Sequence, residues 1–300
     1  MCMALDHAPA TRQTLSGLAH KTLFDGAGGD RTNYLEPAGD PGLYGPQSAA
    51  WRVHSNPVSL AVGGVAAVIL ELAEPRVRTG VWEHSIFRKQ PLLRLRRTGD
   101  ADMVTTYGPT AAAEARIAQV TRMHQRVSGA TPEGQPYHAM DPDLLTWVHV
   151  TAGYGFLNAY VRYVNPKLSR EDQDRYYAEG ERLGQAFGAK WAPRSVAEVE
   201  AYMADFIPNL RPHPIIGEFL DLMRKTSPLG LAGRPAQHLV VEAAIDLLPP
   251  ALREAAGLGR HRRKPGVRTL VRGMAAGAKR VGSDGPAAQA WRRMGMQPPP

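Results

Sequence analysis

From Gly42 onward, apolar residues recur three or four positions apart, the spacing that places them on one face of an α-helix. No alternation with a period of two persists long enough to predict a sheet, and Met103–Tyr107 is the one candidate for extended backbone. Residues 1–41 carry turn signals and little periodicity. The pattern therefore predicts an all-α protein that follows an N-terminal arm, residues 1–41.

One helix is predicted after Gly108, with Pro109 near its start and Ser128-Gly129 at its end. Its apolar face consists of Ile117, Val120, His124 and Val127. Because the arginines of this segment lie off that face, we expect His124 to point toward the core.

A second helix is predicted from Pro142 to about Val164, with Asp141 as its N-cap and Asn165-Pro166 beyond its end. Its apolar face consists of Leu145, His149, Ala152, Phe156 and Tyr160. We therefore expect His149 to point inward as well.

Further helices are predicted at 169–187, 196–203, 215–225 and 237–248, where Gly and Pro mark the boundaries. The most apolar stretch, Val58–Leu70, is shorter than the roughly 20 residues that a bilayer span needs, so it is predicted to be a buried core helix. With 300 residues, 43% of them hydrophobic, the chain is long enough for a single large helical domain over residues 42–258.

The net charge of +8 has a local source, since eight Lys and Arg and no acid lie between Arg260 and Arg280. We expect residues 259–300 to form a flexible, basic, Pro-rich tail that is solvated, with weak attachment to an anionic membrane or nucleic acid as the alternative. No specific nucleic-acid partner is expected. The single cysteine, Cys2, excludes a disulfide framework and cysteine-based metal sites and fits a reducing compartment. The N-terminus lacks a secretory pattern, so a soluble, cytoplasmic protein is expected.

Two histidines on the core faces of consecutive helices suggest chemistry, because each needs a polar partner inside the protein. Neutral imidazole is the commonest biological metal ligand, and a proximal histidine holds haem iron in many helical proteins. A structural role is the alternative for His124 and His149. The sequence lacks the motifs of di-iron bundles, His-Glu-x-x-His and Cys-x-x-Cys sites, dinucleotide folds, P-loops and Gly-x-Ser-x-Gly hydrolases. A bound cofactor is therefore favoured over a bare metal ion.

Arg94 and Thr98 lie one helical turn apart in the segment Arg-Leu-Arg-Arg-Thr. The guanidinium fork of arginine suits a haem propionate or another carboxylate, because it donates two parallel hydrogen bonds. An ordinary ion pair with a threonine cap is the alternative.

Several stretches between Tyr44 and Gly188 occur in the order and spacing of a known family. They are Gly63-Gly64 through Leu70 to Pro75, Gly80-Val81 with His84-Ser85 and Phe87, Pro91 through Arg94 to Thr98, Thr106-Tyr107-Gly108, His124 with Val127 and Gly129, Tyr137-His-Ala-Met-Asp141-Pro142-Asp-Leu144-Leu145-Thr-Trp147-Val148-His149, Asp174-Arg175-Tyr176-Tyr177, and Leu183-Gly184. In combination they resemble the MpaB-like oxygenase family, which includes the bacterial rubber oxygenases (latex clearing proteins), over about half of the chain.

The resemblance implies an all-helical, globin-like core that holds haem b, and oxidation of an apolar, often isoprenoid, substrate by O2. His124 matches the histidine expected as the proximal iron ligand. His149 matches a second family histidine, which is the alternative axial ligand or a group of the distal pocket. Arg94 and Thr98 match an Arg-x-x-x-Thr placed near the haem, and Trp147 is expected to line the apolar cavity.

The sequence departs from the family at two positions: Glu74 precedes Pro75 where histidine is frequent, and Glu71 stands where glutamine is common. The rubber enzymes use a glutamate as candidate base, and Glu83 is the nearest candidate here, out of alignment with it. Two other interpretations stay open. One is a helical protein that binds haem or another apolar ligand without turnover, with both histidines on the iron. The other is an interaction module with core histidines and a basic tail.

Overall fold

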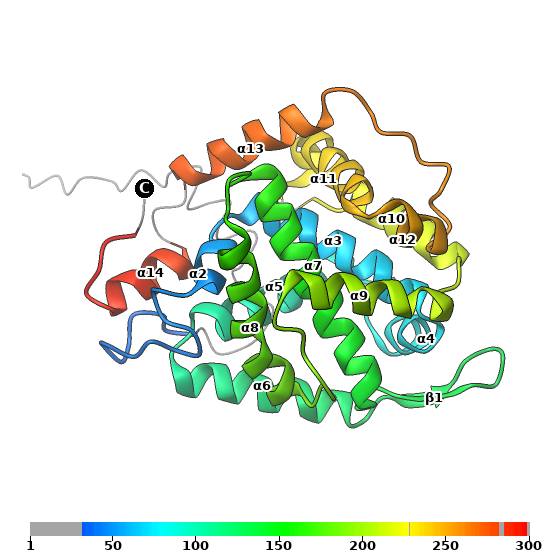
Figure 1. The fold of residues 1–300 in the computed structure, drawn as a ribbon, viewed down its shortest axis with the longest axis horizontal. Helices are drawn as coiled ribbons and strands as arrows, with labels where there is room; N and C mark the ends of the chain where they lie inside the picture. The colour runs from blue at the N-terminus through cyan, green and yellow to red at the C-terminus, as the bar shows by residue number, and fades with distance from the viewer. Residues whose placement is uncertain (1–31, 228, 282–284, 299–300) are drawn as a thin grey trace, which may run out of the picture.

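The computed structural model describes residues 32–227, 229–281 and 285–298, and almost all of its regular structure is helical (Figure 1). The predicted all-α fold class is confirmed. Most of the predicted arm, residues 1–31, lies outside the described residues.

The helices follow one another with short connections, apart from one small hairpin after α6 and the longer segment between α12 and α13. Their bounds are α2 Ala49–Val53, α3 Pro57–Ala73, α4 Pro75–His84, α5 Pro91–Tyr107, α6 Thr110–His124, α7 Pro142–Tyr163, α8 Arg170–Phe187, α9 Val196–Phe206, α10 Pro214–Lys225, α11 Arg234–Leu247, α12 Pro250–Ala255, α13 Val267–Val281 and α14 Pro286–Arg293, with 3-10 turns η1 Ile207–Asn209 and η2 Gly230–Gly233.

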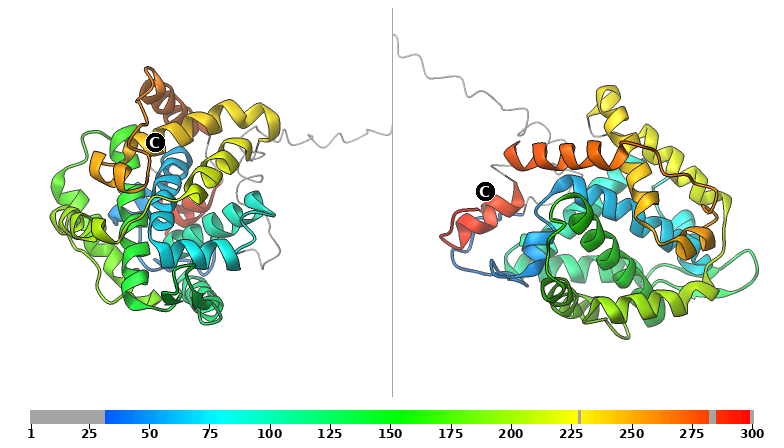
Figure 2. Two further views of the ribbon diagram at one scale, coloured as in Figure 1. Left: turned by 90° about the vertical axis from the view of Figure 1, so that its right-hand side faces the viewer. Right: turned by 45° about the horizontal axis from the view of Figure 1, so that its top comes forward.

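Helices α3 and α7 form the centre of the fold, and they touch at two glycines. A Cβ placed on Gly63 would lie 2.6 Å from the carbonyl carbon and oxygen of Gly155 and 2.8 Å from Cα of Phe156. Figures 1 and 2 show the pair between α11 and α13 on one side and α6 on the other. The main apolar core surrounds this pair and includes Ile69, Leu70, Trp147 and Leu157, all of them fully buried.

Local capping signals place α7 where the sequence predicts it. The Asp141 carboxylate accepts hydrogen bonds from the backbone N–H groups of Asp143 and Leu144. Pro142 occupies the first helical position, where a backbone N–H would have no acceptor within the helix, so the N–H that proline lacks is not missed. The helix ends at Tyr163, close to the predicted Val164.

The structure differs from the sequence-based prediction in two places before α7. Met103–Tyr107, the candidate for extended backbone, is the last turn and a half of helix α5. The segment after His124 forms an antiparallel hairpin, β1 Ser128–Ala130 with β2 Pro136–His138, which the sequence did not predict. The predicted helix after Gly108 therefore stops at His124.

The expectation of a flexible C-terminal tail is wrong for most of its length, because residues 267–281 and 286–293 form helices packed on the body. Val271 and Ala275 of α13 are buried against the core. Arg293 of α14 is 2% exposed and donates three hydrogen bonds to the carbonyl oxygens of Tyr34, Asp40 and Tyr107. A basic residue at this position thus serves internal packing.

Helices α3 and α4 meet at a sharp bend of 109°. Glu74 lies at the bend and caps α4, accepting the N–H of Val77 at 2.7 Å and pairing with Arg76 at 2.8 Å. Within the described residues, no single helix is long and apolar enough to cross a membrane, whereas α3 and α4 taken together pass by length and composition alone.

The α3–α7 contact predicts a difference between two adjacent glycines. Gly63→Ala should lower the free energy of unfolding by about 1–3 kcal/mol, because its Cβ would overlap the backbone of α7. Gly64→Ala is the matched control: its nearest neighbour is the Phe156 ring at 3.8 Å, so it should leave stability unchanged or raise it by about 0.5–1 kcal/mol. Urea unfolding of both variants measures the difference, and equal stabilities would contradict the close contact.

Candidate functional site

His149 projects from α7 onto helix α8, where glycines leave room for its ring. A Cβ on Gly184 would lie 3.1 Å from Nε2 of His149, and one on Gly180 would lie 3.7 Å from the same atom. Burial lowers the pKa of His149 to about 4, so the imidazole is neutral at physiological pH. The ring nevertheless keeps some accessible surface.

His124 is the last residue of α6. Its pKa is lowered by burial and by the positive charge of Arg94, so this imidazole is neutral as well. Helices α5 and α6 pack against each other, which brings Arg94 of α5 close enough to lower the pKa of His124.

These two histidines differ from every other histidine that the structure describes. The other six each have a hydrogen-bond or ion-pair partner: His54, His84, His138, His213, His238 and His261. His54 is the clearest contrast, since its Nδ1 lies 3.1 Å from Oδ2 of Asp102 and its Nε2 lies 3.0 Å from Oη of Tyr176. Among the described histidines, only His124 and His149 have no such partner on either ring nitrogen, which leaves both nitrogens available to a ligand.

Arg94 is an interior arginine without an ion pair. Burial lowers the pKa of its guanidinium, and the facing charge of Glu71 partly restores it. In the part of the chain that the structure describes, the Arg94 guanidinium has no hydrogen-bond partner, and the side chain keeps some accessible surface. A cationic fork with five free donors in the interior is suited to bind a carboxylate from outside the protein.

Glu71 faces Arg94 from the end of helix α3 and was not among the sequence-predicted site residues. Burial raises the pKa of Glu71 to about 7, against the opposing influences of Arg94 and of a hydrogen bond with Thr151. The signal that could have found Glu71 is its isolation, because it is the only charged residue within Pro57–Ala73. A carboxyl group that exchanges its proton near neutral pH is suited to acid–base work.

The first half of α5 is loosely packed. Residues 92–96 are all partly accessible, although a helix resting on a packed core buries one face completely. Three of these residues are leucines, Leu92, Leu93 and Leu95, and the Nε of Arg96 is buried without a partner. The α5 segment around Arg94 therefore presents apolar side chains and unpaired donors next to α6, the helix that ends at His124, a combination that suits an apolar cofactor with carboxylates.

The structure does not bring the remaining sequence-predicted residues into this group. Thr98 is exposed, and its hydroxyl donates to the Arg94 carbonyl oxygen in the helix. Glu83 is exposed at the end of α4 and accepts a hydrogen bond from Tyr137. Trp147 is fully buried and stacks on Phe206 of α9 at 4.0 Å between ring centres, so it supports the core behind α7.

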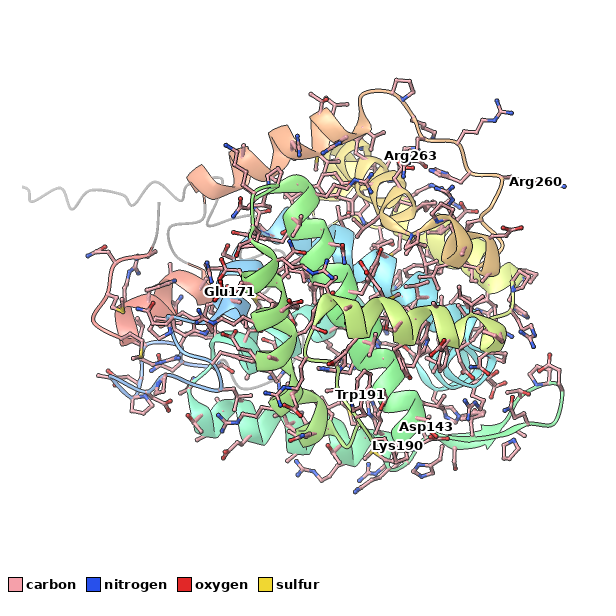
Figure 3. All side chains as sticks on the ribbon, viewed as in Figure 1. Asp143, Glu171, Lys190, Trp191, Arg260 and Arg263 are labelled. Carbon is pink, nitrogen blue, oxygen red and sulfur yellow. The ribbon has the colours of Figure 1, made fainter. Side chains whose placement is uncertain are left out.

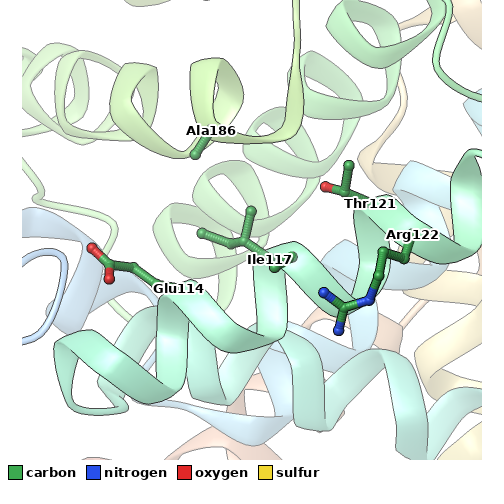
Figure 4. Close-up of a pocket in the computed structure, with 6 residues that line it drawn as sticks. Glu114, Ile117, Thr121, Arg122 and Ala186 are labelled. Carbon is green, nitrogen blue, oxygen red and sulfur yellow. The ribbon is translucent and has the colours of Figure 1, made fainter.

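A hollow of about 410 Å³ lies on the surface between α6 and α8 (Figure 4). It is lined by Glu114, Ile117, Ala118, Thr121, Arg122 and Ala186. None of the predicted site residues lines it, although Ile117 and Thr121 share the helix face that ends at His124.

The donors fit a cofactor with its own metal better than a bare ion. Among the described residues there is no group of three or more His, Cys, Asp or Glu side chains that could hold a metal. Neutral, unpartnered imidazoles with a free interior guanidinium are the donors that haem requires, since its iron needs one or two axial ligands and its propionates need cations. The residues present therefore fit haem.

Residues 51–280 match the protein family described as ER-bound oxygenase mpaB/B'/Rubber oxygenase, catalytic domain. The chain belongs to this family. The match extends through α13, well past the motifs that end at Gly188, and it makes the chain an oxygenase catalytic domain and hence an oxidoreductase. No curated protein and no solved structure matches the chain.

The raised pKa of Glu71 predicts that the stability of this oxygenase domain depends on pH. Its pKa is about 7 in the folded state and 4.5 ordinarily, so the unfolded chain loses its proton first as the pH rises. The contribution of Glu71 to the free energy of unfolding is therefore fully present below pH 4.5. It is lost as the pH rises through 7, which lowers the free energy of unfolding by at most about 3 kcal/mol. Glu71→Gln should remove this loss in urea unfolding of the haem-free protein. The exposed Glu114→Gln is the control, and a Glu71→Gln variant with the wild-type pH slope would contradict the assignment.

Proposed function

We propose that the protein is a haem-b-dependent oxygenase that acts with O2 on an apolar substrate, such as an isoprenoid or another alkene. The observation that carries the proposal is the pair of neutral histidines, His124 and His149, without internal partners. Membership of an oxygenase family whose rubber oxygenases use haem supports it.

His124 is the proposed axial ligand. Its imidazole is neutral, stands at the end of a helix and lies within the electrostatic reach of Arg94, the proposed partner of a haem carboxylate. Haem b supplies, when bound, an iron that binds and activates O2. Arg94 orients the cofactor by donating to a propionate, which also compensates the cost of burying a guanidinium.

His149 is the alternative axial ligand. Its seat on Gly180 and Gly184 fixes the ring on the α8 side of α7, and no described residue holds its nitrogens. If His124 alone held the haem, the cofactor would supply the O2 chemistry that an oxygenase requires. With both histidines on the iron, the protein would instead bind haem without turnover.

Glu71, rather than the exposed Glu83, is the proposed proton acceptor. It lies inside, faces Arg94 and has a pKa of about 7, so it can take up and release a proton at physiological pH. Thr151 of α7, whose hydroxyl donates to the Val148 carbonyl oxygen, is the polar neighbour that favours the charged form of the carboxyl group. The partly accessible leucines of α5 offer an apolar surface to the substrate.

The ligand assignment predicts different spectra for two single variants. Protein from cells fed a haem precursor should have a Soret band that shifts with CO after reduction by dithionite. His124→Ala should lose this band, whereas His149→Ala should retain it. The reverse result would identify His149 as the iron ligand. A band that does not shift with CO would favour a haem protein without catalytic activity. A wild-type protein without any Soret band would show that it does not bind haem.

If Arg94 binds a haem propionate, replacing it should lower the affinity for haem, whereas replacing an arginine elsewhere should not. Arg94→Gln should weaken haem binding about ten-fold or more, since a hydrogen bond to a charged group contributes about 1.5–3 kcal/mol. Arg94→Lys should recover only part of this loss, because lysine lacks the planar fork. Arg126→Gln, which changes an exposed arginine in the turn after α6, should bind haem as the wild type does. Titration of the haem-free proteins with haem measures all four affinities, and equal values would exclude Arg94 from the site.

A further inference from the structure

The chain between α12 and α13 is tied to the body by a hydrogen-bonding contact and an ion pair. His261 lies 3.1 Å from Oδ1 of Asp246, and Lys264 lies 2.9 Å from Oε2 of Glu242. Both acids belong to helix α11 and are buried. This basic segment is therefore held in place, unlike the loose tail that the sequence predicts.

The neighbouring basic residues are exposed to solvent. Arg260, Arg262 and Arg263 on the tied segment, and Arg268 at the start of α13, are all exposed. Arg260 and Arg263 lie on the same upper right part of the molecule in Figure 3. None of the four has a hydrogen bond or ion pair with any residue that the structure describes, and Glu254 is the only acid between residues 250 and 281. The body thus fixes four cations in a solvent-facing array.

Helix α13 also exposes an apolar side chain. Leu270 of α13 is 55% exposed, whereas Val267 and Val271 on the inner face of the same helix are buried. Arg268 and Leu270 lie on opposite flanks of α13, because residues two positions apart on a helix do not share a face. We call the four arginines Arg260, Arg262, Arg263 and Arg268 the arginine surface.

We propose that the arginine surface docks the protein on an anionic lipid membrane. Each basic residue near an anionic leaflet strengthens attachment by about 1 kcal/mol, which is about five-fold in affinity. The two contacts to α11 hold this segment in place, so less backbone entropy is lost on docking.

The composition of the surface favours lipid over nucleic acid as the partner. Proteins that bind single-stranded nucleic acids combine basic grooves with aromatic side chains for base stacking, and residues 258–270 contain no Phe, Trp or Tyr. Attachment to an anionic leaflet needs only clustered basic residues near its surface. A membrane would also concentrate the apolar substrate of the proposed function, but the docking does not depend on haem.

Vesicle sedimentation of the full chain tests the proposal. The protein should sediment with phosphatidylcholine vesicles that contain phosphatidylglycerol, should remain in solution with phosphatidylcholine alone, and should be released by added salt. Replacing Arg260, Arg262, Arg263 and Arg268 by glutamine should weaken binding about five-fold for each arginine removed. Arg122→Gln combined with Arg126→Gln is the control and should bind as the wild type does, since these exposed arginines lie at the end of α6 and in the turn after it. Circular dichroism checks that each variant is folded.

Three results would overturn the proposal. The first is a wild-type protein that does not sediment with the anionic vesicles. The second is binding that the control pair weakens as much as the four-arginine variant does, which would mean attraction by overall charge. The third is binding to duplex DNA or RNA, lost in the four-arginine variant, without binding to vesicles. A protein that docks but shows no Soret band would retain this inference and lose the haem function.

Discussion

The backbone contact between α3 and α7 at Gly63 and Gly155 is the constraint on which the rest of the fold depends. Where two backbones touch, no large side chain fits between them, so the bulky residues of α7 lie to either side of the contact. Trp147 packs outward on α9, and Phe156 lies beside Gly64. The helices that cover the pair are placed by these side chains.

Without a ligand, the unpartnered polar groups in the interior near α5 lower the stability of the protein. A buried donor or acceptor without a partner costs about 1–3 kcal/mol, and a buried charge costs more. His54, held by Asp102 and Tyr176, avoids this cost, whereas His149 does not. A ligand that satisfies Arg94 and the free histidine nitrogens would therefore stabilise the fold as well as complete the site, because it binds the folded state alone.

Local signals in the sequence were sufficient for elements whose ends are set by capping. Asp141 and Pro142 determine the start of α7 without reference to the rest of the protein. Met103–Tyr107 contains β-branched residues that favour strands locally, but it is helical because Tyr107 bonds the Trp51 carbonyl oxygen and Trp51 bonds the Thr106 carbonyl oxygen. Tertiary contacts of this kind leave no periodic pattern, and the packing of α14 was missed for the same reason.

The candidate site was predictable in its histidines and only partly in its charges. The apolar stripes of two helices identified His124 and His149, and the structure leaves these two without partners. The sequence could not separate Glu71 from Glu83, because both are single acids near the ends of helices. Only the fold places one of them inside, opposite Arg94, and the other in solvent.

The three hydrogen bonds of Arg293 also affect how this chain is made. The bond from Arg293 to the Tyr34 carbonyl oxygen spans 259 positions of sequence. At a synthesis rate of about 5–20 residues per second, Tyr34 leaves the ribosome tens of seconds before Arg293 does. During that interval the small apolar cluster of Trp51, Met103 and Tyr107 lacks Ala290, its cover from α14. The last step of folding therefore follows translation of the α14 segment, and a nascent chain stalled before it exposes this apolar cluster to chaperones or to other chains.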